Sequence, residues 1–194
     1  MSTQTDDTKM KLYELHQGVE AAKKALATAL KEAGSVRVED YVFVRTDGTD
    51  VTLTELFGDK SDLLVVHNMG EGCAYCTLWA DGFTGLMPHI LDRCGFALVS
   101  ADDADTAREF SDSRGWNYPV LAANGSSFNA DMGFEKDGGK VLPGVSSFHK
   151  NDEGTIDRIA FAHFGPGDDF CPVWPFLELL KDGANGWSPK FSYA

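Results

Sequence analysis

The chain has 194 residues, 30 of them acidic and 17 basic, and its formal net charge at pH 7 is −13. This length predicts a single domain over residues 1–194, and a hydrophobic content of 43% excludes an intrinsically disordered chain. Neither nucleic acid nor a membrane surface is expected as a partner, because both attract clustered Lys and Arg side chains and the sequence has no basic run. The acidic start over residues 1–7 lacks the features of a signal peptide, and no apolar stretch approaches about 18 residues, so we expect a cytoplasmic protein.

An N-terminal extension, residues 1–35, contains the first predicted element, a helix over residues 8–33. Apolar residues recur there at alternating spacings of three and four, which places them in one stripe: Leu12, Leu15, Val19, Ala22, Leu26, Ala29 and Ala33. Gly34 is a typical helix stop. We expect this helix to pack on the rest of the domain. A homodimer seam is the alternative, although the stripe is short and rich in alanine for a coiled coil.

The core, residues 36–183, alternates predicted strands and helices, and a short tail over residues 184–194 follows it. The turn sequence Asp47-Gly48 is a hairpin signal. In chain order the expected elements are strands at 41–44, 51–53 and 63–67, a helix from the first cysteines to about 93, a strand at 96–99, a helix capped by Asp102 or Asp105 and ending near 115, a strand at 118–121, a Gly-rich excursion at 122–141, strands at 145–150 and 158–164, and a helix from about 172 to 183.

This order of elements predicts an α/β fold with a central mixed sheet and helices on both faces. The strand at 63–67 is a continuous apolar run, which is typical of a strand buried on both faces of a sheet. The final hairpin adds an antiparallel edge. Cys73 and Cys76 follow the strand at 63–67, at the edge where open α/β sheets place their sites.

The sequence Cys-Ala-Tyr-Cys at residues 73–76 opens a predicted helix. Unpaired N–H groups and the positive end of the helix dipole stabilise a thiolate at the first cysteine, and the second lies on the same face, close enough to form a disulfide. In a reducing compartment this spacing favours redox chemistry or metal binding. For redox chemistry we assign Cys73 as the nucleophile and Cys76 as the resolving cysteine. Zinc is the alternative, but Cys94 and Cys171 stand alone and form no second pair.

A CxxC after the first core strand and a proline just before the hairpin resemble the thioredoxin fold. The proline is Pro143, in the sequence Val-Leu-Pro-Gly-Val at residues 141–145. In thioredoxin-like proteins the corresponding proline follows a cis peptide bond and lies against the cysteine pair, where its neighbour's backbone binds the partner peptide. The resemblance therefore implies a cis Pro143 and a substrate-binding role for Leu142 and Pro143. An ordinary trans proline at the start of a strand is the alternative.

A series of short motifs supports a closer resemblance over about residues 10–165. They are Val36-Arg37-Val38-Glu39-Asp40-Tyr41-Val42-Phe43, a strand ending in His67, the CxxC, Trp79-Ala80-Asp81, Gly115-Trp116, Ser126-Ser127-Phe128-Asn129 and Pro143-Gly144. The chain resembles a bacterial family of thioredoxin-like proteins called domain of unknown function 899. The segment Asp169-Phe170-Cys171-Pro172 departs from the pattern of that family. The resemblance implies the fold of a disulfide oxidoreductase and supplies no substrate.

Three residues near the cysteines extend the candidate site. Thioredoxins carry a buried acidic residue six positions before the first cysteine, and here His67 holds that position. An imidazole there is suited to take the proton of Cys76, and a core histidine hydrogen-bonded at a strand end is the alternative. Tyr75 is placed to contact a small thiol such as glutathione, as in glutaredoxins, or to cover the disulfide. Trp79 is named with Tyr75 as a substrate-binding candidate, and it is expected to pack behind the pair and help fix it in place.

The charges close to the pair in the sequence predict a weakly activated thiol. Residues 61–92 contain no Lys or Arg, and four carboxylates lie among them or at their end: Asp62, Glu71, Asp81 and Asp92. Carboxylates raise the pKa of a nearby thiol. We therefore expect a pKa of Cys73 only modestly below that of a free thiol, and substrates that are neutral or basic.

These residues favour a thiol–disulfide oxidoreductase that cycles Cys73 and Cys76 against a protein or small-molecule disulfide. A thiol-dependent peroxidase that uses the same cysteines, with Cys171, is the alternative, weakened because Gly70 stands where peroxiredoxins have an activating Thr or Ser. A non-enzymatic metal-binding or partner-binding module is the third hypothesis, with His163 as a distant metal ligand. We expect no cofactor and no resident metal. The glycines form no dinucleotide fingerprint, so electrons must come from an external reductant.

Overall fold

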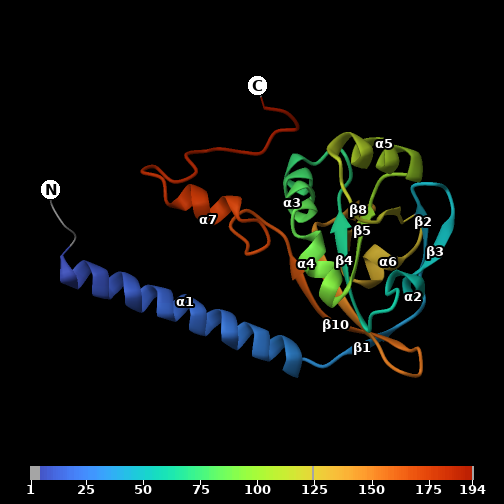
Figure 1. The fold of residues 1–194 in the computed structure, drawn as a ribbon, viewed down its shortest axis with the longest axis horizontal. Helices are drawn as coiled ribbons and strands as arrows, with labels where there is room; N and C mark the ends of the chain where they lie inside the picture. Colours follow the sequence, from blue (N-terminus) through green and yellow to red (C-terminus); the bar gives the residue numbers. More distant parts are fainter. Residues whose placement is uncertain (1–4, 124, 194) are drawn as a thin grey trace.

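The computed structural model describes residues 5–123 and 125–193, and its centre is an eight-stranded sheet (Figure 1). The bounds of these strands are β1 Val36–Val38, β2 Val42–Arg45, β3 Asp50–Thr52, β4 Asp62–Asn68, β5 Gly95–Ser100, β6 Val120–Ala122, β9 Gly144–Lys150 and β10 Ile156–His163. A separate small sheet pairs β7 (Glu135–Lys136) with β8 (Lys140–Val141). Residues 1–4 of the acidic N-terminal segment, residue 124 of the predicted Gly-rich excursion and residue 194 of the tail lie outside the described residues.

The three central strands, β4, β5 and β6, run parallel, and antiparallel strands flank them on both sides. The complete order is β1-β10-β9-β4-β5-β6-β2-β3. The hairpin of β9 and β10 joins β4, and the hairpin of β2 and β3 joins β6. These pairings confirm the predicted α/β fold with a mixed central sheet. β1, which pairs with β10 at the edge, was not predicted, because three residues show too little periodicity to reveal a strand.

Helices cover both faces of the sheet, as predicted. Their bounds are α2 Leu53–Leu56, α3 Ala74–Thr84, α4 Met87–Arg93, α5 Ala104–Arg114 and α6 Phe128–Asp131. Val65 and Val99 face a core that they share with α2 and α6, whereas Val66 and Leu98 face a second core with α3, α4 and α5. Figure 1 shows α3 and α4 on one side of β4 and α6 on the other. Successive side chains of a strand point to opposite faces, so each central strand supplies both cores.

Two predicted helices have different bounds in the structure. The helix expected from the cysteines to about residue 93 is interrupted at Gly85 and Leu86, and Pro88 in the first turn of α4 favours a new start there. The last helix, α7, covers only Val173–Glu178 and is shorter than the predicted range of 172 to 183.

The prediction that Asp102 or Asp105 caps α5 is wrong, because Asp103 is the cap. The Asp103 carboxylate, rather than that of Asp102 or Asp105, accepts a hydrogen bond from Thr106 N at 2.8 Å. Asp102 is directed instead toward the turn that precedes the cysteines, where its carboxylate accepts a hydrogen bond from Glu71 N.

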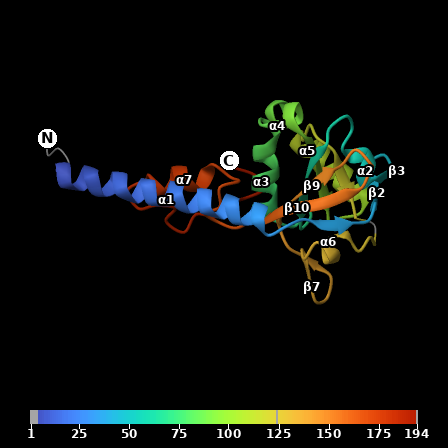
Figure 2. The ribbon, with the colours of Figure 1, turned by 90° about the horizontal axis from the view of Figure 1, so that it is seen from below.

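The predicted N-terminal helix is confirmed as α1, Asp6–Glu32, but the expectation that it packs on the domain is wrong. It projects away from the sheet, beside α7 (Figures 1 and 2), and none of its residues is buried. Both faces of the sheet are already covered by other helices, which leaves α1 only the strand edge and the C-terminal segment. It touches β10, and Lys23 forms an ion pair with Asp169 at 2.8 Å. Within the described ranges no helix, α1 included, combines the length and apolarity that a membrane crossing requires.

We expect Gly144→Ala to destabilise the fold. A Cβ at Gly144, the first residue of β9, would overlap the Phe134 ring and the backbone oxygen of Ala162. The expected loss in the free energy of unfolding is about 1–3 kcal/mol, the usual cost of overpacking, and urea denaturation measures it. Gly165→Ala is the control, because a Cβ built there meets no atom within 4 Å. Equal losses for the two variants would contradict this expectation.

Candidate active site

The cysteine pair follows β4 across a tight turn, residues 69–72. Gly70 has a φ of 95°, in the left-handed region that favours glycine, and its N–H donates to the Asn68 side chain at 2.8 Å. A Cβ at Gly70 would overlap the Asp102 carboxylate, which accepts a hydrogen bond from Glu71 N at 2.8 Å. An acidic residue just after β5, the neighbouring parallel strand, therefore holds this turn in place.

Cys73 is the N-cap residue of α3. Its sulfur accepts a hydrogen bond from Cys76 N at 3.1 Å, and its carbonyl oxygen accepts bonds from the N–H and the hydroxyl of Thr77, both at 3.0 Å. Both cysteines are free thiols, and the side chain of Cys76 interacts with the Cys73 sulfur closely enough to shift the pKa of Cys73. Cys73 is half-buried, whereas Cys76 is only 2% exposed. An incoming molecule therefore meets Cys73 first.

The pKa values of the two thiols shift in opposite directions. The hydrogen bond from the Cys76 thiol lowers the pKa of Cys73 to about 6, against the effect of burial, and backbone hydrogen bonds from Cys76 and Tyr75 and the charge of Lys140 add to the lowering. The same thiol contact, followed by burial, raises the pKa of Cys76. At neutral pH the pair therefore consists of a thiolate at Cys73 and a protonated thiol at Cys76.

The pKa of Cys73 falls further than the sequence predicted. That prediction weighed nearby carboxylates, whereas neutral donors at the start of the helix have the larger effect. Lys140 was missed because it reaches the site from β8, far along the chain. The role of Asp102 was also missed, although its place just after the strand next to β4 is a sequence signal for this edge of the sheet.

His67 lies in β4 at the position predicted for a proton acceptor, but its ring is engaged elsewhere. Its Nδ1 donates to Asn129 Oδ1 at 2.7 Å, and the Ser146 hydroxyl donates to its Nε2 at 2.9 Å. The ring is fully buried and stacks on Phe134 with centroids 4.0 Å apart. Burial lowers the pKa of His67 to about 3, so the imidazole is neutral at neutral pH. This geometry matches the alternative of a core histidine rather than a base for Cys76.

Leu142 and Pro143 lie at the same edge of the sheet as the cysteines, because the next residue, Gly144, pairs with the end of β4. The cis peptide bond expected before Pro143 is wrong, since that bond is trans. Leu142 N donates to Phe134 O at 2.7 Å, and Pro143 O accepts from Phe164 N at 3.0 Å. The backbone thus satisfies its hydrogen bonds with the trans bond, which is also the form that an X–Pro bond prefers by about 0.5–1 kcal/mol.

Tyr75 and Trp79 lie one turn apart on α3, on the side that faces α7. The Tyr75 ring stacks on Trp174 with centroids 6.2 Å apart, and Trp79 Nε1 donates to Asp168 at 3.3 Å. Trp79 is 3% exposed, in agreement with the predicted packing behind the pair. Tyr75 also lines a cavity of about 560 Å³, together with His16 of α1 and residues of the C-terminal segment. Tyr75 therefore connects the CxxC segment with this cavity.

The other two cysteines are buried away from solvent. Cys171 lies in the apolar core behind α3, and burial raises its pKa. Cys94 donates a hydrogen bond to Ile90 O at 3.6 Å, and burial raises its pKa as well. The ring of His163 packs on Phe134 with centroids 4.8 Å apart. Over residues 5–123 and 125–193, no three His, Cys, Asp or Glu side chains gather where they could hold a metal ion.

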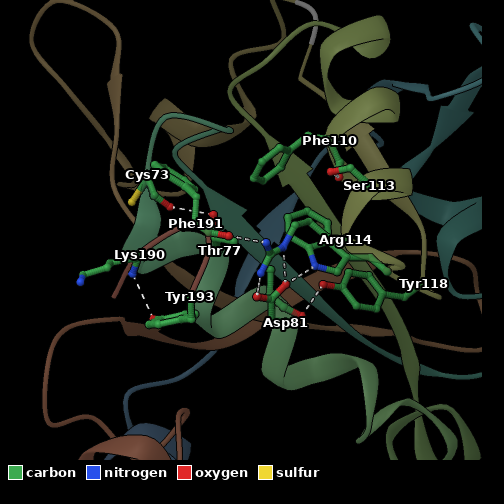
Figure 3. A network of polar contacts seen from close by, with 12 residues as sticks. Cys73, Thr77, Asp81, Phe110, Ser113, Arg114, Tyr118, Lys190, Phe191 and Tyr193 are labelled. Atoms are coloured by element: carbon green, nitrogen blue, oxygen red, sulfur yellow. Dashed lines mark hydrogen bonds and ion pairs between the residues drawn. The ribbon is translucent and has the colours of Figure 1, made fainter. Parts of the chain in front are cut away.

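Asp81 anchors α3 further along the helix from Cys73 (Figure 3). Its carboxylate accepts hydrogen bonds from the Arg114 guanidinium, with the Nε contact at 3.0 Å, and from Trp116 Nε1 at 2.9 Å. Arg114 also donates to the carbonyl oxygen of Phe191 at 2.8 Å, which ties the tail to α5. This network fixes the same helix whose first turn holds the Cys73 sulfur.

The sequence model of a bacterial protein family of unknown function, DUF899, matches residues 4–190. This chain belongs to the DUF899 family. The match extends through the C-terminal segment that contains Cys171, beyond the range of the resemblance seen in the motifs. No curated protein matches the chain.

Solved structures similar to this DUF899 protein include two named as peroxiredoxins or related to them. Peroxidoxin BcpB from Mycobacterium tuberculosis has a TM-score of 0.55 and 18% identity over 66% of this chain and 84% of its own. A peroxiredoxin-like protein from Aquifex aeolicus has a TM-score of 0.54 and 16% identity over 66% and 74%. A hypothetical protein from Sinorhizobium meliloti 1021 has a TM-score of 0.50 and 17% identity over 81% and 87%. At these identities the similarity establishes the thioredoxin-like fold alone.

We expect Cys76→Ala to raise the pKa of Cys73 above its value of about 6, because alanine removes the largest cause of the lowering. A hydrogen bond to a charged group is worth about 1.5–3 kcal/mol, which corresponds to a rise of about one to two pKa units. The pH dependence of iodoacetamide alkylation at Cys73, read by mass spectrometry, measures this value. Cys76→Ser is the matched control, since its hydroxyl still donates and should hold the midpoint closer to that of the wild type. An unchanged midpoint in Cys76→Ala would show that the thiol contact does not activate Cys73.

Proposed function

We propose that this DUF899 protein is a thiol–disulfide oxidoreductase that cycles Cys73 and Cys76 between dithiol and disulfide. The observation that carries the proposal is the pairing, at the start of α3, of a half-buried Cys73 with a pKa of about 6 and a buried, protonated Cys76. A thiolate is the nucleophile of disulfide exchange, and a neighbouring thiol resolves the mixed disulfide that results.

In the proposed reaction the Cys73 thiolate attacks one sulfur of a substrate disulfide. A mixed disulfide forms at Cys73, and the other substrate sulfur leaves as a thiolate. Cys76 then loses its proton and attacks the Cys73 sulfur, which forms the Cys73–Cys76 disulfide and releases the second substrate thiolate. Two electrons pass from the protein to the substrate, and an external dithiol reduces the pair again.

The opposite pKa shifts set the order of these steps. The pKa of Cys76 is raised first of all by its hydrogen bond to the Cys73 sulfur. Once Cys73 is part of a mixed disulfide, its sulfur is no longer a thiolate, so this cause disappears and Cys76 becomes easier to deprotonate. The departing substrate thiolate is the proposed proton acceptor, because both ring nitrogens of His67 are bonded to Asn129 and Ser146.

The proposed substrate is a protein or small-molecule disulfide, and the proposed electron donor is a dithiol reductant of the cytoplasm. Leu142, Pro143 and Tyr75 are the proposed substrate contacts, because two of them lie at the sheet edge where the cysteines lie and the third belongs to the CxxC itself. The net charge of −13 favours substrates that are neutral or basic.

Disulfide turnover tests the proposal directly. With insulin or glutathione disulfide as substrate and dithiothreitol as reductant, we expect the wild type to turn over and Cys73→Ser to fall to the uncatalysed background. Cys76→Ser should stop at the mixed disulfide, because the resolving thiol is missing, and mass spectrometry detects this adduct at Cys73.

Two matched controls accompany this assay. Cys94→Ser and Cys171→Ser each remove one buried thiol whose pKa is raised, so both should retain the turnover of the wild type. Cys73-dependent consumption of hydrogen peroxide, without turnover of either disulfide, would overturn the proposal in favour of a thiol peroxidase.

The pKa of Cys73, about 6, also predicts the reduction potential of the pair. A stabilised thiolate favours the dithiol form, and CxxC proteins whose nucleophile has a pKa near about 7 or about 3.5 have potentials near about −270 mV and −120 mV, respectively. We expect the Cys73–Cys76 couple to lie between these values. Equilibration with thiol–disulfide buffers at neutral pH measures it, and a potential below that of the more reducing class would contradict the stabilised thiolate.

A further inference from the structure

The apolar stripe of α1 has no covering element among the described residues. Four of its side chains are between 44% and 62% exposed: Leu12, Leu15, Val19 and Leu26. None of the 27 residues of α1 is buried, although most of the stability of a helix in a protein comes from the packing of its apolar face. An exposed apolar stripe along a whole helix is typical of an interaction surface.

The rest of the chain covers only one flank of this stripe. Three residues at seven-residue spacing lie on that flank, His16, Lys23 and Leu30. His16 lines the cavity shared with α7, Lys23 pairs with Asp169 at 2.8 Å, and Leu30 is half-buried. The other flank carries four residues, also seven positions apart, each of which stands directly before a residue of the stripe: Lys11, Gly18, Ala25 and Glu32. The stripe and this second flank are therefore open to another helix.

The stripe is complementary to itself when two copies lie antiparallel. Its residues occupy the a and d positions of a heptad, and an antiparallel pair about a twofold axis places each a residue against a d residue of the other copy. The resulting layers join Leu12 to Ala29, Leu15 to Leu26 and Val19 to Ala22 of the second copy, each formed twice. A larger side chain meets alanine in two of these layers, so the alanines leave room for the facing side chains.

The charges of α1 also favour this arrangement. Residues 6–20 carry four acidic and two basic side chains, whereas residues 21–32 carry three basic side chains and one acidic side chain. Antiparallel pairing places the acidic half of each copy against the basic half of the other, whereas parallel pairing would place like charges together. As a whole α1 is neutral, although the chain has a net charge of −13, so two copies approach through α1 without the repulsion of the acidic core.

The open flank provides an independent observation. In the antiparallel register Lys11 meets Glu32 and Gly18 meets Ala25 of the second copy. Glycine inside a helix costs about 1 kcal/mol relative to alanine, and nothing lies within 4 Å of a Cβ built at Gly18, so its own chain does not require glycine there. The close approach of a second helix supplies a reason for the small residue.

We propose that two copies of this chain form a homodimer by antiparallel pairing of their α1 helices, with Leu15 of each copy against Leu26 of the other. The contact is isologous and closes on itself. It follows from the exposed stripe, the charge pattern and the open flank of α1, and it does not depend on the proposed redox function.

Light scattering of the full chain after gel filtration tests the dimer. The wild type should have twice the 21.1 kDa mass of one chain. The double variant L15E/L26E should have the mass of a single chain, because it places glutamates opposite each other in two layers. Since α1 has no buried residue, this variant should keep the fold, and an unchanged alkylation midpoint of Cys73 checks that it does.

M10E/Y13E is the matched control. Met10 and Tyr13 are 59% and 61% exposed, close to the 59% and 62% of Leu15 and Leu26, but they lie outside the stripe. The control therefore adds the same charge to the same helix and should remain a dimer. A wild type with the mass of one chain, or an equal loss of mass in both double variants, would overturn the proposal. A monomeric wild type that binds neutral phosphatidylcholine vesicles would assign the stripe to a lipid surface, and this result would also overturn the proposal.

Zero-length carbodiimide crosslinking tests the direction of pairing. Lys11 and Glu32 lie about 30 Å apart along one helix, at 1.5 Å per residue, so a crosslink between them has to join two copies. Mixed light and nitrogen-15-labelled chains should yield this product, and L15E/L26E should lose it. Interchain products that join the same ends of the two helices, such as Lys31 with Glu32, would show parallel pairing and contradict the proposed register.

Discussion

The interaction of the Cys76 side chain and backbone N–H with the Cys73 sulfur is the contact on which the chemistry of the site depends. It gives the two thiols opposite pKa shifts, so that Cys73 is a thiolate nucleophile and Cys76 keeps its proton. The contact exists because Cys73 caps α3 and Cys76 lies in the first turn, so any displacement of this helix start would disturb it. The structure holds that start from two sides, through Asp102 at the preceding turn and through Asp81 further along the helix.

Local patterns were sufficient to predict the elements that carry the cysteines. The apolar run of β4 and the CxxC at a helix start both follow from residues close in sequence, and the structure places them as predicted. The charge on Lys140 and the partners of His67, which are Asn129 and Ser146, come from segments more than sixty residues away. No periodicity in the sequence reports such contacts, so the environment of His67 and the contribution of Lys140 were not predicted. The pKa of Cys73 was predicted too high for a local reason, because donors at the start of α3 have a larger effect than the nearby carboxylates.

Two other predictions were wrong because of contacts with distant parts of the chain. They are the cis bond before Pro143 and the packing of α1 on the domain. The trans bond before Pro143 accompanies hydrogen bonds that Leu142 and Pro143 make with Phe134 and Phe164, residues that the sequence pattern did not connect with the proline. The periodicity of α1 was interpreted correctly as a helix with one apolar face. Its packing was not, because helical periodicity says which face is apolar and not whether a sheet face remains free to receive it.

The burial of His67 couples the stability of the whole fold to acid. The ring lies between Phe128 and Phe134 with a pKa of about 3, against an ordinary value of 6.5. As the pH falls below that ordinary value, an unfolded chain takes up a proton that the folded chain does not bind, so folding becomes less favourable until the pKa of the folded state is reached. Over part of the same range the Cys73 thiolate is protonated, since its pKa is about 6. Acidification therefore removes the nucleophile and weakens the scaffold together, and this protein is chemically matched to surroundings near neutrality.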